Sequence, residues 1–498
     1  MPSFWKSFVR HVPRNRISAV LVFAAALLLV VWGLTAVLLK PADDGAKRVA
    51  ALPTERFVGD LGEIRERRVL RALVVPSNSD FFLSGARIEG LQARLLLEFE
   101  KQLNRGIRRA EDRVRVQFLP VTFDRLIPEL EAGHGDIAAA MLTLTPERER
   151  RVAMISAKAM PVNEVVVTHR GSEPVRSIED LAGREVHVVR GSSYAEHLRE
   201  LNEVFDEQGL DPVEIHEADS TLIGEDMLEL VNAGVVDLTV VDDFKARLWA
   251  KVYTDIVIHN DVRLSEGGHV GWAVRKGNPE LQASLQQFLR KVRQGTLLGN
   301  MLNAQFLGRS ESISDPTSPE DRRKLDAVRS LFERYAKRYE FDPLALLAQA
   351  YHESGLDQSR RSSRGAVGMM QLLPSTARDP AVGIPNISSI ENNVHAGAKY
   401  MAYLRDRYFS TDDIPADEQM AFVWAAYNAG PGRVSQMRRL AEKMGLDPNR
   451  WWGNVEVAAG RLVGRETVKY VADIHKYQIA YNLLDQHERQ RAERTEGG

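Results

Sequence analysis

The chain has 498 residues, a formal net charge of −2 and no cysteine. Its length suggests about two to four domains, and its composition, 44% hydrophobic and 27% charged, is ordinary for a globular protein. The charge gives no electrostatic case for nucleic acid binding, and the absence of thiols excludes disulfides, thiolate metal sites, a cysteine nucleophile and a lipoprotein anchor.

The N-terminal segment predicts export. Residues 17–39 carry no charge and are long enough to span a bilayer, which needs roughly 20 apolar residues. Residues 1–16 carry basic side chains and no acid, so the positive-inside rule places them in the cytoplasm and the rest of the chain outside. A cleaved signal peptide is the alternative, but no small-x-small cleavage site follows Leu39. We expect an inner-membrane anchor with a periplasmic catalytic part; the alternative is a cleaved signal and peripheral association with the outer membrane.

Residues 40–65 are polar and small, and are interpreted as a linker. From 66 to 309, apolar β-branched runs alternate with helical patterns. The predicted strands are 69–75, 114–119, 136–140, 186–189, 213–215 and 236–241, and the predicted helices are 91–103, 123–132 and two that start at 193 and about 225. The β-α-β-α-β order predicts parallel strands, and its recurrence after residue 176 predicts a bilobed α/β binding domain.

Residues 310–322 are interpreted as a second linker because they are rich in serine, proline and acids. From 323 to 486 nearly every segment has apolar positions at helical spacing, which predicts an all-α domain. Residues 487–498 form a charged tail that we expect to be disordered. The fold class is therefore multidomain, with a transmembrane helix, a bilobed α/β domain and a helical domain.

One glutamate in the helical domain has the features of a general acid. Asp342 can cap a helix that has Pro343 at its first position, and Gly355 can end it, so Glu353 falls in the last turn. The negative end of the helix dipole and burial both disfavour an ionised carboxylate there, which raises its pKa. A carboxyl group of this kind can donate a proton near neutral pH. The alternative is an ordinary solvated helix glutamate.

Two turns downstream of Glu353 support a binding site. Gly365, Gly368 and the turn at 369–371 allow a ligand to approach the backbone closely, and the Gln371 amide can bond a sugar hydroxyl or amide. The methionines at 369 and 370 could pack on a sugar face or simply in the core. Residues 427–432 read Tyr-Asn-Ala-Gly-Pro-Gly, which forms a turn whether or not it binds anything.

These motifs together resemble the soluble lytic transglycosylase domain, over about 160 residues by motif spacing. The matching segments, in chain order, are Glu353-Ser354, Ser362, 365–371 (Gly-Ala-Val-Gly-Met-Met-Gln), 425–430 (Ala-Ala-Tyr-Asn-Ala-Gly) and 466–470 (Glu-Thr-Val-Lys-Tyr). The resemblance implies a lysozyme-like helical fold, bacterial peptidoglycan as partner, no cofactor and no metal. It implies Glu353 as the catalytic residue and the following substrate-binding residues: Ser362, Gly368, Met369, Met370, Gln371, Tyr427, Asn428 and Tyr470. Met369 replaces the usual leucine, and Leu356 stands where an aromatic residue is common, which puts one sugar-stacking contact in doubt.

The implied reaction needs one carboxylate, whereas ordinary glycosidases use two. Glu353 would protonate the bond between N-acetylmuramic acid and N-acetylglucosamine and then deprotonate the muramoyl 6-hydroxyl, which gives a 1,6-anhydro end. Asp357, four residues further on, could serve as a second carboxylate for hydrolysis, although a solvated loop role is the simpler interpretation. A goose-type lysozyme that uses water and a non-catalytic wall-binding sensor are therefore the alternatives.

Residues 66–309 resemble the amino-acid type of extracytoplasmic solute-binding proteins, in the segments 142–148 (Leu-Thr-Leu-Thr-Pro-Glu-Arg), 191–193 (Gly-Ser-Ser) and 236–242 (Val-Asp-Leu-Thr-Val-Val-Asp). The resemblance implies that Arg148 holds a ligand carboxylate, that Ser192 offers a hydroxyl and that Asp242 takes a ligand amine. A solvated charge run at Arg148 and a strand-end cap at Asp242 are the alternatives. The fusion of the two domains resembles membrane-bound lytic transglycosylases, in which an amino acid or muropeptide could control access to Glu353.

Overall fold

The structure is a computed structural model and describes residues 48–77, 79–85, 87–158, 161–292, 319–411 and 413–496. The predicted span at 17–39 and the first part of the predicted linker lie outside these ranges. Within them, no helix combines the length and the apolar composition that crossing a bilayer requires.

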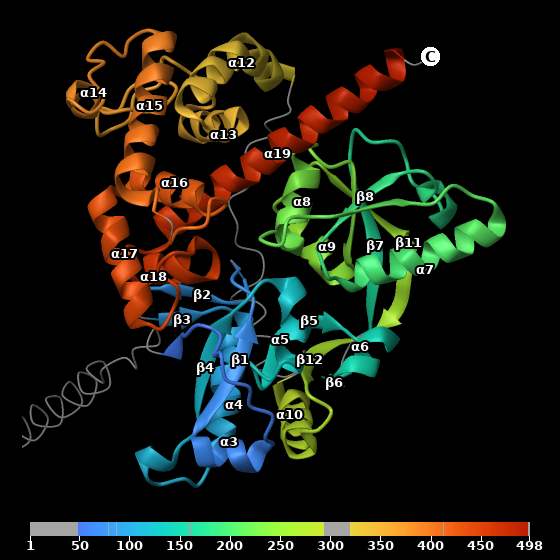
Figure 1. The fold of residues 1–498 in the computed structure, drawn as a ribbon. Helices are drawn as coiled ribbons and strands as arrows, with labels where there is room; N and C mark the ends of the chain where they lie inside the picture. Colours follow the sequence, from blue (N-terminus) through green and yellow to red (C-terminus); the bar gives the residue numbers. More distant parts are fainter. Residues whose placement is uncertain are drawn as a thin grey trace, which may run out of the picture. The chain divides into compact units, whose positions relative to one another are not determined.

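The first lobe is built on a five-stranded sheet in the order β4-β1-β5-β12-β6 (Figure 1). Its elements are α3 (Leu61–Arg67), β1 (Val69–Val74), β2 (Phe82–Ser84), β3 (Arg87–Glu89), α4 (Leu91–Leu103), η2 (Ala110–Asp112), β4 (Arg115–Pro120), η3 (Phe123–Arg125), α5 (Leu126–Glu131), β5 (Ile137–Thr143), α6 (Pro146–Arg151), β6 (Ala153–Ile155), β12 (Val270–Val274) and α10 (Pro279–Val292). Helix α3 begins inside the predicted linker 40–65, and Val49, in the same segment, is buried and bridges to Phe118 of β4.

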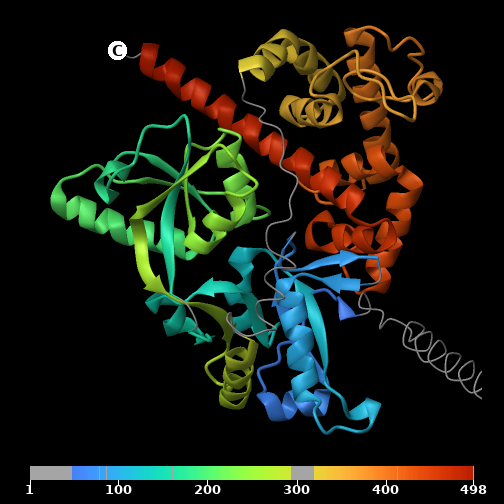
Figure 2. The ribbon, with the colours of Figure 1, turned by 180° about the vertical axis from the view of Figure 1, so that it is seen from behind.

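The second lobe has its own five-stranded sheet, in the order β11-β7-β10-β8-β9. Its elements are β7 (Val162–His169), η4 (Ile178–Leu181), β8 (Glu185–Val188), α7 (Ser193–Gln208), β9 (Glu214–Glu217), α8 (Gly224–Asn232), β10 (Leu238–Asp242), α9 (Asp243–Trp249) and β11 (Ile256–Gly268). The chain therefore enters this lobe through β7 and returns to the first lobe after β11 (Figure 2).

Both sheets are mixed, which corrects the expectation of parallel strands. Strand β12 runs antiparallel to β5 and β6, and β7 runs antiparallel to β10 and β11. The remaining pairs, β1 with β4 and β5, and β8 with β9 and β10, are parallel as the alternating pattern predicts. The antiparallel strands are those next to the two passages between lobes, where no helix intervenes to bring the chain back in the same direction.

The C-terminal domain is helical, in agreement with the periodicity. Its elements are α12 (Pro319–Tyr339), α13 (Pro343–Ser354), α14 (Pro374–Arg378), α15 (Ile390–Leu404), η5 (Arg405–Phe409), α16 (Gln419–Ala429), α17 (Pro431–Lys443), η6 (Trp451–Val455), α18 (Glu456–Leu462) and α19 (Arg465–Glu496). Helix α12 begins inside the predicted second linker, and α19 continues through most of the tail that we expected to be disordered.

Helix α19 joins the helical domain to the second lobe. It packs on α13 within its own domain, and Ala480 belongs to the apolar core of the second lobe (Figure 1). Lys476 Nζ lies 2.6 Å from Glu229 Oε2 of α8, and it is 3.4 Å from carboxylate oxygens of Asp226 and Asp473. A buried lysine among three carboxylates fixes α19 against α8, since leaving such charges unpaired costs several kcal/mol, about 3–5.

Candidate active site and ligand pocket

Glu353 lies in the last turn of α13, as the local sequence predicts. Asp342 caps the start of the helix, where its Oδ1 accepts a bond of 3.0 Å from the amide of Leu344. Gly355 (φ 65°) and Leu356 (φ 59°) both adopt the left-handed conformation that ends the helix. That conformation strains a leucine, and burial of the Leu356 side chain in the core offsets the strain.

The Glu353 carboxyl group is half-buried and has one close partner. Tyr470 Oη of α19 donates a hydrogen bond of 2.6 Å to Glu353 Oε1. Burial raises the pKa of Glu353, while the Tyr470 hydrogen bond, the His352 side chain and Arg360 oppose the rise without cancelling it. Because the raised pKa keeps the carboxyl group protonated to higher pH, Glu353 has the chemistry of a general acid.

The partner tyrosine is itself held in place. Tyr470 is buried, and the ring of His352 packs edge-on against its ring at a centroid distance of 4.8 Å. His352 Nε2 lies 3.8 Å from Asp473 Oδ2, one turn along α19 from Tyr470. The buried position and the nearby Glu353 charge raise the pKa of Tyr470 well above its ordinary value, so its hydroxyl remains a donor.

The glycine-framed turn is fixed through its backbone. The amide of Met369 donates to Gln358 Oε1 at 3.1 Å, and the amide of Met370 donates to Asn393 Oδ1 at 2.8 Å. Gly368 has φ 79°, and a Cβ there would lie 2.6 Å from both Asn393 Nδ2 and Gln358 Oε1. The position therefore requires glycine for its conformation as well as for space.

The carbonyl groups of the same turn are also bonded, and its methionine side chains lie in the core. Tyr427 Oη donates to the Met370 carbonyl at 2.6 Å, and Ser354 Oγ donates to the Met369 carbonyl at 2.9 Å. Met370 is fully buried, and Met369 is 4% exposed. Of the two roles that the sequence left open for these methionines, the structure favours core packing over contact with a sugar, because neither side chain reaches the surface.

The other predicted substrate residues lie on the surface or partly exposed. Ser362 caps the turn that follows α13, with its Oγ accepting from the amide of Ala366 at 3.0 Å. The Gln371 amide nitrogen donates to the Gly368 carbonyl at 2.8 Å, while the exposed Asn428 accepts a bond of 2.8 Å from Thr467 Oγ1. Tyr427 and Asn428 lie in the last turn of α16, and only Gly430 separates this helix from α17. Thr467 precedes Tyr470 on α19, so the end of α16 and the late tyrosine meet at one place.

Asp357 is not arranged as a partner of Glu353. It lies beyond the end of α13 and is exposed, whereas the sequence left open a place on the same helix face. Its Oδ1 accepts bonds of 2.7 Å from both the amide and the hydroxyl of Ser359, and these bonds lower its pKa. The arrangement is that of a solvated turn residue.

A second candidate site is a pocket of about 80 Å³ between the two lobes of the α/β domain. Arg148 lines it, but its side chain is 2% exposed and already engaged. Its Nε lies 3.0 Å from Glu196 Oε1, its Nη1 donates to the Thr143 carbonyl at 3.1 Å, and its Nη2 donates to the Gly191 carbonyl at 3.0 Å. In this arrangement of the lobes the chain's own groups engage all three guanidinium nitrogens of Arg148, so a ligand carboxylate would have to replace Glu196.

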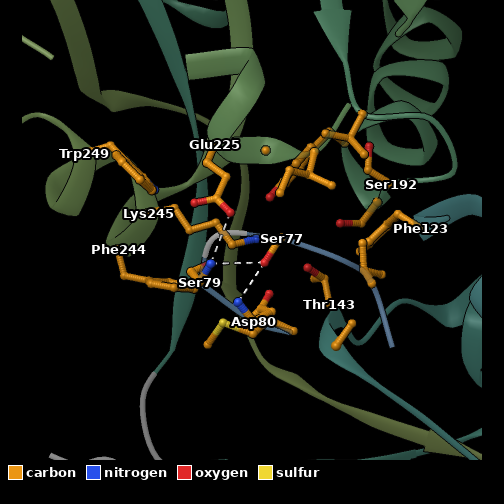
Figure 3. Close-up of a pocket in the computed structure, with 18 of the residues that line it drawn as sticks. Ser77, Ser79, Asp80, Phe123, Thr143, Ser192, Glu225, Phe244, Lys245 and Trp249 are labelled. Carbon is orange, nitrogen blue, oxygen red and sulfur yellow. Dashed lines mark hydrogen bonds between the residues drawn. The ribbon is translucent and has the colours of Figure 1, made fainter. Parts of the chain in front are cut away.

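Asp242 is likewise occupied. It caps α9, and Lys245, one turn into that helix, folds back so that its Nζ lies 2.8 Å from Asp242 Oδ2. Figure 3 shows Lys245 reaching into the pocket beside Glu225. The chain's own ammonium thus stands where the sequence predicts a ligand amine. Ser192, in contrast, is buried at the pocket wall, and among the described residues its Oγ has no hydrogen-bond partner, so it remains available to a ligand.

Several residues of these sites escaped the sequence argument. Asn393 could have been found, because it is a polar residue among the apolar positions of the segment that forms α15. In the structure it is fully buried. The pairing of Lys245 with Asp242 could have been found from their spacing of three residues. His352, Glu196 and Glu225 gave no such signal, since their roles depend on segments far away in the chain.

One group of side chains in the described part of the chain has the spacing of metal ligands. The ligand atoms of Glu185, Glu214 and His216 lie within 4.8 Å of one another on the surface of the second lobe. They are partly or fully exposed and belong to neither site.

Comparisons with known proteins identify both domains. The family described as Transglycosylase SLT domain matches residues 330–447, and the family described as Bacterial extracellular solute-binding proteins, family 3, matches residues 76–306. Two relatives, from Desulfosudis oleivorans and Photobacterium profundum, are each named membrane-bound lytic murein transglycosylase F. The first is 29% identical over 73% of this chain and 80% of the relative, and the second is 28% identical over 86% and 83%. A solved ancestral arginine-binding protein bound to arginine is 25% identical and covers 48% of this chain and 98% of its own, with a TM-score of 0.38.

Proposed function

The chain belongs to the membrane-bound lytic murein transglycosylases of type F, which join a family 3 solute-binding domain to an SLT domain, and from this premise we propose how it acts. Its SLT domain acts on peptidoglycan as a lytic transglycosylase. Glu353 cleaves the β-1,4 bond between N-acetylmuramic acid and N-acetylglucosamine and leaves a 1,6-anhydromuramoyl end. The half-buried carboxyl group with its raised pKa, bonded to Tyr470, is the observation that carries this proposal.

Glu353 acts first as acid and then as base. Its proton goes to the glycosidic oxygen as the bond from that oxygen to C1 of the muramoyl sugar breaks, and the substrate's own acetamido oxygen supports the electron-poor C1. The Glu353 carboxylate then takes the proton of the muramoyl 6-hydroxyl, whose oxygen bonds to C1. The carboxyl group ends protonated, as it began, and no water is consumed. Tyr470 orients Glu353 and stabilises its ionised form between the two steps.

Substrate recognition is assigned to the surface beside Glu353. Gly368 and Gln371 form the fixed turn. Ser362 and Asn428 supply polar groups at the surface. Tyr427 holds the turn in place through its hydrogen bond to the Met370 carbonyl. Met369 and Met370 contribute packing that fixes the turn, since their side chains are buried and their backbone groups are bonded within the domain.

Hydrolysis of the same bond, as in goose-type lysozymes, is the second candidate. It would need a group to activate water, and the exposed, turn-bound Asp357 is poorly suited to that role. A non-catalytic wall-binding sensor is disfavoured, because it would not require a carboxyl group with a raised pKa bonded to Tyr470.

The mass of the cleavage product distinguishes lytic transglycosylation from hydrolysis, and the absence of any product would indicate a wall-binding sensor. Purified sacculi would be digested with the full chain in detergent and with its Glu353→Gln variant, and the products weighed by mass spectrometry. Glu333→Gln, at an exposed position of α12, is the matched control. Anhydromuramoyl products from the wild type and the control alone support the proposal. Products heavier by one water indicate hydrolysis, and equal cleavage by Glu353→Gln would remove Glu353 from the mechanism.

The relatives are named membrane-bound, which supports a membrane-bound location in the cell envelope for this chain. We place the anchor at residues 17–39 in the inner membrane, with both folded domains in the periplasm, because basic residues alone precede this segment. Loss of membrane association on deletion of residues 1–40 would support the anchor, while an N-terminus mapped beyond Leu39 in the mature protein would favour a cleaved signal.

Ligand binding between the lobes is proposed to regulate access to Glu353, with an amino acid or muropeptide as ligand. Helix α8 supports this proposal, because it carries Glu225 at the pocket and Glu229 at the contact with Lys476 of α19. Helix α19 in turn carries Tyr470, which bonds Glu353. A movement of α8 on ligand binding would therefore shift α19, and with it the Tyr470 hydroxyl that bonds the catalytic carboxyl group.

A further inference from the structure

The pocket between the lobes lacks the free groups that a zwitterionic amino acid needs. A carboxylate would have to displace Glu196 from Arg148, and an ammonium group would have to displace Lys245 from Asp242. Thr145 Oγ1 also donates to Glu196 Oε2 at 2.7 Å, which strengthens the first of these internal pairs. Both anchors thus already form ion pairs within the chain.

The rest of the pocket wall carries two carboxyl groups that lie outside these internal pairs. Its two basic residues, Arg148 and Lys245, are each neutralised by a carboxylate, whereas the two acids that line it, Asp80 and Glu225, form no ion pair within the described residues. Asp80 accepts one bond of 3.3 Å from Gln92, and Glu225 Oε1 accepts one of 3.2 Å from Ser79 Oγ. Figure 3 shows Glu225 above and Asp80 below, with Ser77 and Ser79 between them.

The Glu225 carboxyl group is buried and incompletely hydrogen-bonded. Glu225 is only 9% exposed, and among the described residues its Oε2 has no hydrogen-bond partner. A buried carboxyl oxygen without a partner costs about 1–3 kcal/mol or more. Burial, together with the charges of Asp226 and Asp80, raises the pKa of Glu225 to about 8. A bound cation would reverse this effect by favouring the ionised carboxylate.

Aromatic side chains complete a site for an organic cation. Phe123, Phe244 and Trp249 line the same pocket, and aromatic faces attract ammonium and guanidinium groups. The volume of about 80 Å³ has room for several waters, or for one small charged group on an apolar stem. It is too small for a whole wall peptide unless the lobes separate.

We infer that this pocket binds a primary amine or guanidinium group on a short apolar stem, with Glu225 and Asp80 as its counter-ions and without a contact to an α-carboxylate. The inference rests on the proposed solute-binding role of the α/β domain and defines the chemistry of its ligand. The cation can be a free amine or the side-chain amine of a wall peptide, since both offer the same group.

Calorimetric titration of the full chain in detergent tests the inference. The probes are n-butylamine and agmatine as cations without a carboxylate, norvaline as the zwitterion of similar size, and butyrate as the anion. We expect both cations to bind, with at least tenfold tighter affinity than norvaline and with no heat from butyrate. A wall peptide that carries a free amine, titrated before and after acetylation of that amine, distinguishes the two sources of the cation.

Two variants locate the binding. Glu225→Gln is expected to weaken agmatine binding at least tenfold, whereas Glu207→Gln, an exposed position on α7, leaves it unchanged. Lys245→Met is expected to tighten it several-fold, because a like charge leaves the pocket. The inference is overturned if norvaline binds better than the cations, if Glu225→Gln binds agmatine as the wild type does, or if no cation binds at millimolar concentration. Digestion of sacculi by the same preparations reports separately on the proposed enzyme activity.

Discussion

Replacing Tyr470 by phenylalanine removes one hydrogen bond from the catalytic carboxyl group, together with a contact to the buried Gln349. Tyr470 is buried, and phenylalanine keeps its ring and its contact with His352. The lost bond, 2.6 Å from Tyr470 Oη to Glu353 Oε1, favours the ionised carboxylate. A hydrogen bond to a charged group is worth about 1.5–3 kcal/mol. Because Glu353 is only half-buried, the lower limit applies, which corresponds to a rise in pKa of about one unit.

The sign of the expected change follows from the role of Glu353. The first step needs the protonated acid, so kcat/KM falls as pH rises through the pKa of Glu353. In Tyr470→Phe this alkaline limb should move to higher pH by about one unit. The plateau rate should fall about tenfold, since the carboxylate that serves as base loses about 1.4 kcal/mol of stabilisation and its fixed orientation.

The assay is release of soluble muropeptides from sacculi between pH 4 and 9, with initial rates fitted to the pH profile. Tyr335→Phe is the matched control, because Tyr335 also donates to a glutamate, Glu391, on the neighbouring helix α15. An unchanged alkaline limb in Tyr470→Phe would refute the argument that this bond sets the pKa of Glu353. Loss of activity at every pH without a shift would instead assign Tyr470 to direct contact with the substrate.

Three further changes test the surroundings of the two sites. Gly368→Ala should destabilise the catalytic domain by about 2 kcal/mol or more, seen as a lower Tm, because the new Cβ meets Asn393 in a left-handed conformation; an unchanged Tm would contradict this. Lys476→Met should cost about 3–5 kcal/mol in urea unfolding, since it removes the buried ammonium group that lies among Glu229, Asp226 and Asp473, and an equally stable variant would show that α19 does not depend on this contact. The raised pKa of Glu225, about 8 against an ordinary 4.5, means that the folded chain binds more protons than the unfolded one, so stability falls as pH rises from 4.5 to 8. Glu225→Gln should therefore be more stable than the wild type at pH 8.5, by on the order of 3 kcal/mol, and no more stable at pH 4; a pH-independent difference would count against the shift.

The local features of the catalytic helix follow from the sequence alone. Asp342, Pro343 and Gly355 bound α13 through short-range bonds and backbone conformation, and this places Glu353 at the helix end. The alternation of apolar β-branched runs with helical patterns in 66–309 likewise predicts two α/β lobes, because each pattern depends on neighbouring residues.

Only the tertiary structure decided which groups face each other. The Tyr470–Glu353 bond joins residues 117 positions apart, and the antiparallel strands result from passages between lobes that no local pattern marks. Arg148 and Asp242 had the right identities for an amino-acid site, yet Glu196 and Lys245 occupy them. A residue's chemistry can be read from its type, but its availability depends on the charges that folding brings within a few ångströms, since burial strengthens every such pair.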